Sequence, residues 1–113
     1  MGAAFKVHSY LGPGLLENVY QACLKHELNK RGLKALTEVG MPVEYDGICL
    51  DLGYRIDLLV ENKIVVELKA QHSLTPLHRS QLFTYLKLSG RPLGLLINFG
   101  QRHLKDGIHR IAN

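Results

Sequence analysis

The sequence predicts an α/β fold, an α+β sandwich with a mixed central sheet, in a single domain over residues 1–113. One observation is the order of the patterns: helical spacing of apolar residues, then strand-like runs, then helical spacing again before a last apolar run. The other is the position of that later helix, because a helix is the usual crossover between parallel strands. With 113 residues, 46% of them hydrophobic, the chain can bury a core.

Two helices are expected at the start of the chain. Apolar side chains follow helical spacing in residues 2–11, and Gly12-Pro13-Gly14 ends that segment. The second helix is expected from Gly14 to about Arg31, with Gly32 directly after it. Its apolar stripe consists of Leu16, Tyr20, Cys23, Leu24 and Leu28.

An antiparallel meander of three strands is expected next. The first strand spans residues 33–45, and Pro42 indicates an edge position or a bulge. Asp46-Gly47 is a tight hairpin turn that leads into the second strand, residues 48–60, which is bent at Gly53.

The remaining elements complete an α-α-β-β-β-α-β order with a short tail, which includes the α-β-β-β-α-β core of the predicted fold. The third strand, residues 64–70, precedes a helix over 75–89 that begins with a Thr-Pro pair suited to its first positions. Residues 93–99 form an apolar strand whose composition predicts burial on both faces. The tail carries Asp106-Gly107, which is expected to close a last hairpin.

Three charged residues interrupt the apolar hairpin formed by the second and third strands. Asp57 lies in one strand, and Glu67 and Lys69 lie in the other. A buried charge costs several kcal/mol unless it is paired or bound to a metal. The presence of three charged residues in this hairpin therefore requires a structural or a chemical explanation.

The register of this hairpin decides whether the two acids share a site. Side-chain alternation places Glu67 and Lys69 on one face of their strand. A three-residue loop would put Asp57 directly opposite Glu67, whereas a two-residue loop would put the acids on opposite faces. We expect the three-residue loop, Glu61 to Lys63, or an equivalent bulge. The paired carboxylates would then suit a hard cation such as Mg²⁺, and the lysine could orient or deprotonate a water.

The composition of the chain excludes only a few classes of protein. The net charge of +4 and the pI near 9.2 are compatible with a polyanionic partner but are shared by many small proteins. Cys23 and Cys49 lack metal-ligand spacing and are expected to be free thiols. The sequence shows no signal peptide pattern and no apolar run of about 18 residues, so we expect a cytoplasmic protein without a membrane segment.

Taken together, these motifs resemble the GxxExxY family of the PD-(D/E)xK nuclease-like superfamily. The name-giving motif stands here as Gly14-Leu15-Leu16-Glu17-Asn18-Val19-Tyr20. The superfamily pattern of an acid followed by (D/E)-x-K corresponds to Asp57 and Glu67-Leu68-Lys69. The residue before the acid is Ile56 and not proline, and the first helix is shorter than is usual in the family, as if residues were missing upstream.

The resemblance implies a restriction-endonuclease-like core and hydrolysis of phosphodiester bonds in DNA or RNA with Mg²⁺ or Mn²⁺. Asp57, Glu67 and the backbone carbonyl of Leu68 would be metal ligands, and Lys69 would position the attacking water. Glu17 would add a carboxylate from the second helix.

The resemblance also implies supporting residues and partners. Gln81 and Tyr85 match a Q-x-x-x-Y element that contacts substrate or orders the site, and Tyr20 is expected to order the site or simply to pack in the core. The charged hairpin face could instead be a solvated salt-bridged surface, and Glu17 could simply favour the helix dipole. Alternatively, the fold would serve as a binding or assembly module with little turnover. A homodimer or a partner chain would then supply specificity.

Overall fold

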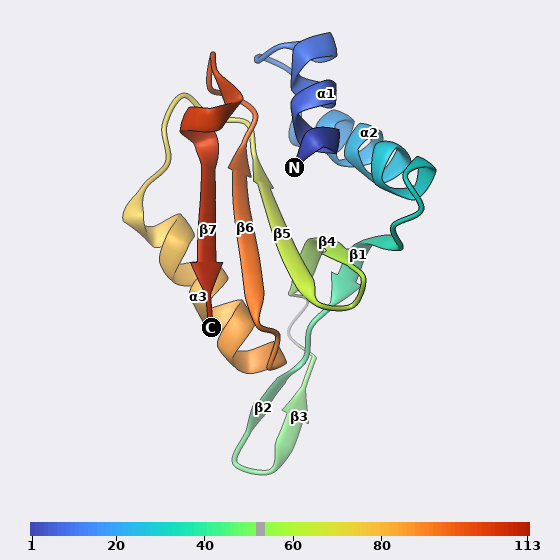
Figure 1. Ribbon diagram of the computed structural model, residues 1–113. Helices are drawn as coiled ribbons and strands as arrows, with labels where there is room; N and C mark the ends of the chain where they lie inside the picture. The colour runs from blue at the N-terminus through green and yellow to red at the C-terminus, as the bar shows by residue number, and fades with distance from the viewer. Residues whose placement is uncertain (52–53) are drawn as a thin grey trace.

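The computed structural model describes residues 1–51 and 54–113, so the bend predicted at Gly53 lies outside the described residues. Its elements, labelled in Figure 1, run in this order: α1 (Gly2–Leu11), α2 (Glu17–Lys30), β1 (Ala35–Gly40), β2 (Val43–Tyr45), β3 (Ile48–Leu50), β4 (Arg55–Val60), β5 (Ile64–Lys69), α3 (Pro76–Ser89), β6 (Leu93–Asn98), the 3-10 helix η1 (Leu104–Gly107) and β7 (Ile108–Ala112).

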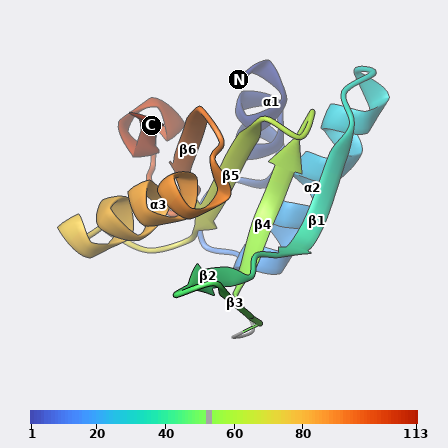
Figure 2. The same cartoon turned by 90° about the horizontal axis from the view of Figure 1, so that it is seen from below.

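A five-stranded mixed sheet forms the centre of the molecule. Its strand order is β1-β4-β5-β6-β7, in which β5 and β6 are parallel and the other neighbours are antiparallel. Helix α3 makes the crossover between the two parallel strands, and the views in Figures 1 and 2 show it on the opposite side of the sheet from α1 and α2. The predicted restriction-endonuclease-like sandwich is therefore confirmed.

Each face of the sheet has its own apolar core, because side chains alternate along the strands. The core under α1 and α2 includes Ala4, Val7, Tyr20, Leu24, Leu58, Val66, Leu68 and Phe99. The core under α3 includes Met41, Leu59, Val65, Leu82, Leu86 and Leu96. Within the described chain, no helix combines the length and apolar character that crossing a membrane requires.

The first two predicted strands are each divided, which corrects the simple meander. The strand predicted over 33–45 ends at Gly40, and β2 begins at Val43 and pairs with β3 in a separate two-stranded sheet. Pro42 has no N–H to donate to a continuous ladder, and the neighbouring Met41 side chain is buried in the α3 core. The predicted turn is confirmed, with positive φ of 52° at Asp46 and 74° at Gly47.

Two further boundaries differ from the sequence prediction. Helix α2 begins at Glu17 and not at Gly14, whose φ of 104° is incompatible with a right-handed helix. The tail does pair antiparallel with β6 as β7, but Asp106-Gly107 lie in η1 and do not form a two-residue turn.

Asn98 fixes the backbone at the end of the parallel strands. Its fully buried side chain accepts hydrogen bonds from the backbone N–H of Gln71 and of Gly100, both at 3.0 Å, and donates to the carbonyl of Gln71 at 2.9 Å. A Cβ at Gly100 would collide with the backbone of Gln71, so glycine is required for this close approach. These contacts hold the chain just after Lys69, which pairs with Asn98 across the two strands.

We predict that Asn98→Leu destabilises the protein by about 3 kcal/mol, because buried backbone groups of Gln71 and Gly100 would lose their partners. The measurement is the free energy of unfolding in urea. The control is Asn18→Leu at an exposed position of α2, which should change stability by less than about 0.5 kcal/mol. Equal effects of the two substitutions would contradict the role assigned to Asn98.

Candidate functional site

The β4–β5 hairpin has the register that brings its acids together. Val60 pairs with Ile64, so the loop has three residues, and the backbone N–H of Lys63 donates to the carbonyl of Val60 at 3.0 Å. Glu61 and Asn62 both have positive φ, 53° and 56°, as a tight hairpin turn with left-handed central residues requires. The predicted three-residue loop is confirmed, and the two-residue alternative is wrong.

One further step along this register places Asp57 opposite Glu67 on the side of the sheet that faces α3. Asp57 accepts a hydrogen bond through Oδ2 from the backbone N–H of Leu68, at 2.8 Å. Burial raises the pKa of Asp57, and this hydrogen bond is the main effect that opposes the rise. Asp57 is therefore a half-buried carboxylate that accepts a hydrogen bond from one backbone N–H group.

The carboxylate of Glu67 is less well compensated for its burial than that of Asp57. Its Oε1 atom is buried and has no hydrogen-bond partner within the described chain. Burial and, to a smaller extent, the charge of Asp57 raise the pKa of Glu67 to about 8, while the Asp57 backbone and the Lys69 ammonium oppose the rise. A buried carboxylate oxygen without a donor is costly for folding and is available to a proton or a cation.

Glu17 reaches the same site from the first turn of α2. Burial raises its pKa, the positive charge of Lys69 opposes the rise, and the charge of Asp57 adds to it. Four predicted residues, Glu17, Asp57, Glu67 and Lys69, are thus brought together electrostatically from three separate elements.

Tyr20 builds the turn that delivers Glu17. Its side chain is fully buried and stacks on Phe99, with ring centroids 4.5 Å apart. Its hydroxyl donates to the carbonyl of Gly12 at 2.5 Å and accepts from the backbone N–H of Leu15 at 3.1 Å. Tyr20 therefore packs in the core and holds the loop that precedes α2.

Helix α3 contributes an aromatic side chain to the rim of the site. Burial raises the pKa of the Tyr85 hydroxyl, and the charge of Glu67 adds to the rise. The ring of Tyr85 meets that of Tyr54 edge to face, with centroids 5.8 Å apart. Gln81 lies one turn earlier and is exposed, and it lines with Tyr85 and Tyr54 an open pocket of about 400 Å³.

Glu38 is a neighbour of the site that the sequence did not indicate. Its φ is 53°, and it lies in β1 opposite Asp57, between the pairs Thr37–Leu58 and Val39–Ile56. The side-chain amide of Gln21 joins the two strands, since its Nε2 donates to Glu38 Oε1 and to the Asp57 carbonyl, both at 2.8 Å. The Glu38 charge also raises the pKa of Asp57. Glu38 lies next to Asp57 because β1 pairs with β4, and local sequence patterns do not predict that pairing.

The carboxylates fit a two-carboxylate metal site. Among the described residues, no group of three or more His, Cys, Asp and Glu side chains is arranged to hold a metal ion. Mg²⁺ is usually bound through one or two protein carboxylates together with waters and substrate oxygens. Asp57 and Glu67 meet that requirement, and the unpartnered Glu67 Oε1 is the atom that a cation would satisfy.

The comparison with known families agrees with this arrangement of an acid and an E-x-K sequence on adjacent strands. The family model described as the PD-(D/E)XK nuclease superfamily matches residues 1–111. The chain belongs to this superfamily. The match does not separate the GxxExxY family from the rest of the superfamily.

A solved structure of the same fold is that of SSO0001. It matches with a TM-score of 0.63 at 25% sequence identity, over 86% of this chain and 50% of the other. The chain thus spans about half the length of SSO0001, and the likeness supports the PD-(D/E)XK fold. No curated protein matches the sequence.

The raised pKa of Glu67 predicts that metal-free protein loses stability as the pH rises. The folded state holds this proton more tightly than the unfolded chain, so stability falls between the ordinary value of 4.5 and about 8. The slope is up to about 1.4 kcal/mol per pH unit. Urea unfolding of Glu67→Gln should show a smaller slope and higher stability at the upper end of this range.

The matched control is Glu61→Gln, at the exposed turn of the same hairpin, which should keep the slope of the unsubstituted protein. If Glu67→Gln and the unsubstituted protein lose stability in parallel over this range, Glu67 does not carry the buried proton.

Proposed function

We propose that this chain is a divalent-metal-dependent nuclease that hydrolyses phosphodiester bonds in DNA or RNA. The observation that supports it most is the half-buried pair Asp57 and Glu67, in which the buried Glu67 Oε1 atom has no hydrogen-bond partner among the described residues. Folding alone gives no reason to retain such a group, whereas binding of a cation does. Membership of the nuclease superfamily supports the same reaction class.

The residues that would hold Mg²⁺ or Mn²⁺ are Asp57, Glu67 and the backbone carbonyl of Leu68. Glu17 would be an additional carboxylate near the ion, since among the described residues it is not arranged with Asp57 and Glu67 as a three-carboxylate site. The bound ion would polarise the phosphate and lower the pKa of a water. Without a cation, Glu67 keeps its proton near neutral pH. Binding of a cation would release that proton, so affinity should increase as the pH rises.

Lys69 would orient the attacking water and stabilise negative charge that develops on the phosphate. It lies on the same face of β5 as Glu67, and its ammonium interacts electrostatically with Glu17, Asp57 and Glu67. The asparagine contacts at Gln71 and Gly100 keep the end of β5 fixed, which limits the positions that Lys69 can adopt.

The substrate would enter along the α3 side of the site. Gln81 and Tyr85 line an open pocket on this side, and Tyr85 interacts electrostatically with Glu67. The phenol ring offers a surface on which a base could stack. The net charge of +4 favours a polyanion. The free thiols of Cys23 and Cys49 fit a reducing compartment, and we propose the cytoplasm.

We predict that Mg²⁺ or Mn²⁺ stabilises the protein at pH 8. At a concentration ten times the dissociation constant, the gain is about 1.4 kcal/mol, and Asp57→Asn or Glu67→Gln should abolish it. Thermal unfolding and calorimetric titration measure the effect, and Glu61→Gln is the control that should retain it. Absence of binding at millimolar concentrations, with and without nucleic acid, would refute the metal-dependent nuclease.

We predict that Lys69→Ala lowers the rate of metal-dependent cleavage of DNA or RNA by about 100-fold or more, because water orientation and charge stabilisation are lost together. Lys63→Ala, in the turn at the other end of the same strand, is the control that should cleave at the unsubstituted rate. Cleavage that is unchanged in Lys69→Ala would indicate a contaminant. Nucleic-acid binding without cleavage would instead assign the chain as a binding module.

A further inference from the structure

The β2–β3 hairpin projects from the body of the molecule and has one entirely apolar face. Figure 1 shows it extending beyond the end of the main sheet, and its strands make their principal contacts with each other. Val43 pairs with Leu50 and Tyr45 pairs with Ile48, so these four side chains share one face. The opposite face carries Glu44 and Cys49.

Most of this apolar face is uncovered in the single chain, while Val43 at its base is half-buried and lines a pocket with Met41 and Tyr54. Tyr45 is 71% exposed, Ile48 is 57% exposed and Leu50 is 37% exposed. A two-stranded sheet is marginally stable by itself in water and usually needs another surface against its apolar side. Four apolar side chains gathered on one face of a projecting hairpin therefore indicate a docking surface.

The charge of the hairpin favours a positively charged protein surface over nucleic acid as the occupant. Residues 43–50 contain two acids, Glu44 and Asp46, and no lysine, arginine or histidine. The rest of the chain holds all fourteen lysines and arginines and eight of the ten acids. An acidic hairpin would be repelled by phosphate groups, but it is attracted to the remainder of a second copy of this chain.

A groove that fits the hairpin lies between α1 and α2. Its volume is about 700 Å³, and its lining includes Val7, Tyr10, Leu11, Ala22, Cys23 and His26. Tyr10 at its edge is 89% exposed. The groove is thus apolar, open and of a size to receive side chains from another molecule.

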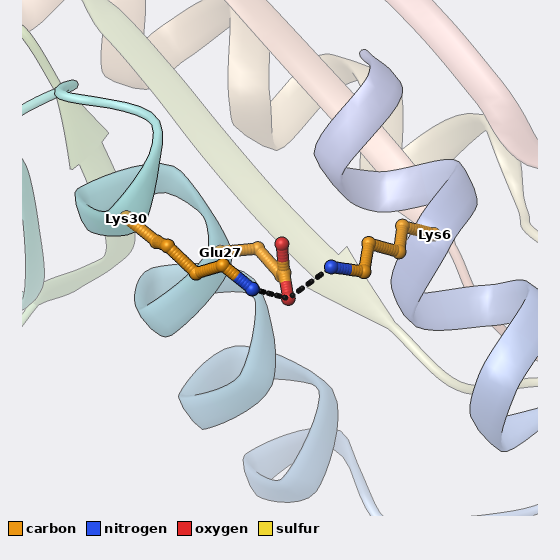
Figure 3. A network of polar contacts seen from close by, with 3 residues as sticks. All are labelled: Lys6, Glu27 and Lys30. Atoms are coloured by element: carbon orange, nitrogen blue, oxygen red, sulfur yellow. Dashed lines mark ion pairs between the residues drawn. The ribbon is translucent and has the colours of Figure 1, made fainter.

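The rim of this groove is positively charged. The Nζ atoms of Lys6 and Lys30 lie 3.1 Å and 3.8 Å from the same Glu27 oxygen. Figure 3 shows the two lysines converging on this one carboxylate from α1 and from the end of α2. Two ammonium groups against one carboxylate leave one positive charge beside the groove, which complements Asp46 in the turn of the hairpin.

We propose that two copies of this chain form a dimer in which each inserts the apolar face of its β2–β3 hairpin into the α1–α2 groove of the other. The hairpin and helix α1 lie toward opposite ends of the molecule in Figure 1. In a two-fold arrangement of this kind each copy makes both contacts, and the assembly closes without further growth. This arrangement does not depend on the nuclease reaction.

The first test is the oligomeric state by sedimentation velocity, from micromolar concentrations to about 1 mM. The unsubstituted protein is expected to dimerise. Ile48→Asp places a charge on the docking face and should weaken the dimer about 30-fold or more, while Cys49→Asp on the opposite face should leave it unchanged. A monomer at every concentration would overturn the proposal, as would equal weakening by both substitutions.

The second test identifies the surface that the hairpin meets. Ile48→Cys in a Cys49→Ser background should form a disulfide with Cys23 of the other copy on mild oxidation. Adding Cys23→Ser should abolish the covalent dimer, and the unsubstituted chain, with Cys49 on the wrong face, should give none. A covalent dimer that persists without Cys23 would mean that hairpins meet each other, which would overturn the groove assignment.

Discussion

The structure depends on the partial burial of two carboxylates, Asp57 and Glu67, which lie side by side in an apolar hairpin. Each would cost several kcal/mol if it stayed ionised without partners. The backbone N–H of Leu68 compensates Asp57, but Glu67 Oε1 has no partner in the described chain, so burial favours its protonated form. A core designed only for stability would place apolar side chains here. The energetic cost of the unpartnered Glu67 oxygen is therefore the feature that connects this fold to the proposed metal chemistry.

Two neighbouring residues, Tyr20 and Asn98, hold the backbone around that pair in place. Tyr20 is held by stacking on Phe99 and organises the loop that carries Glu17 to the site. Asn98 fixes the backbone after Lys69 with three hydrogen bonds from one buried amide. Buried polar side chains stabilise a fold when their hydrogen-bonding groups have partners. The Tyr20 hydroxyl and the Asn98 amide both have backbone partners. Rigidity is therefore concentrated where the charged residues leave the strands.

Some predictions from the sequence failed for reasons that lie in tertiary packing. The first strand ends early because the side chain of Met41 is buried under α3 and Pro42 interrupts the ladder, which frees β2 and β3 to form their own hairpin. Periodicity across 33–45 contains no information about this change of sheet. Glu38 was missed for a similar reason. Its place beside Asp57 follows from the pairing of β1 with β4, and strand pairing between distant segments is not encoded in local spacing.

The sequence by itself predicted two helices before the strands, the crossover helix α3, the three-residue turn of the central hairpin and the superfamily to which the chain belongs. These follow from local patterns, since turn residues, side-chain alternation and helix ends act over a few residues. Only the tertiary structure decided that Glu67 Oε1 is buried without a partner, that Glu17 interacts with Lys69, and that an apolar hairpin face is exposed. Those properties depend on solvent exclusion by segments far apart in the chain, and burial sets both the pKa of a carboxylate and the cost of an exposed apolar face.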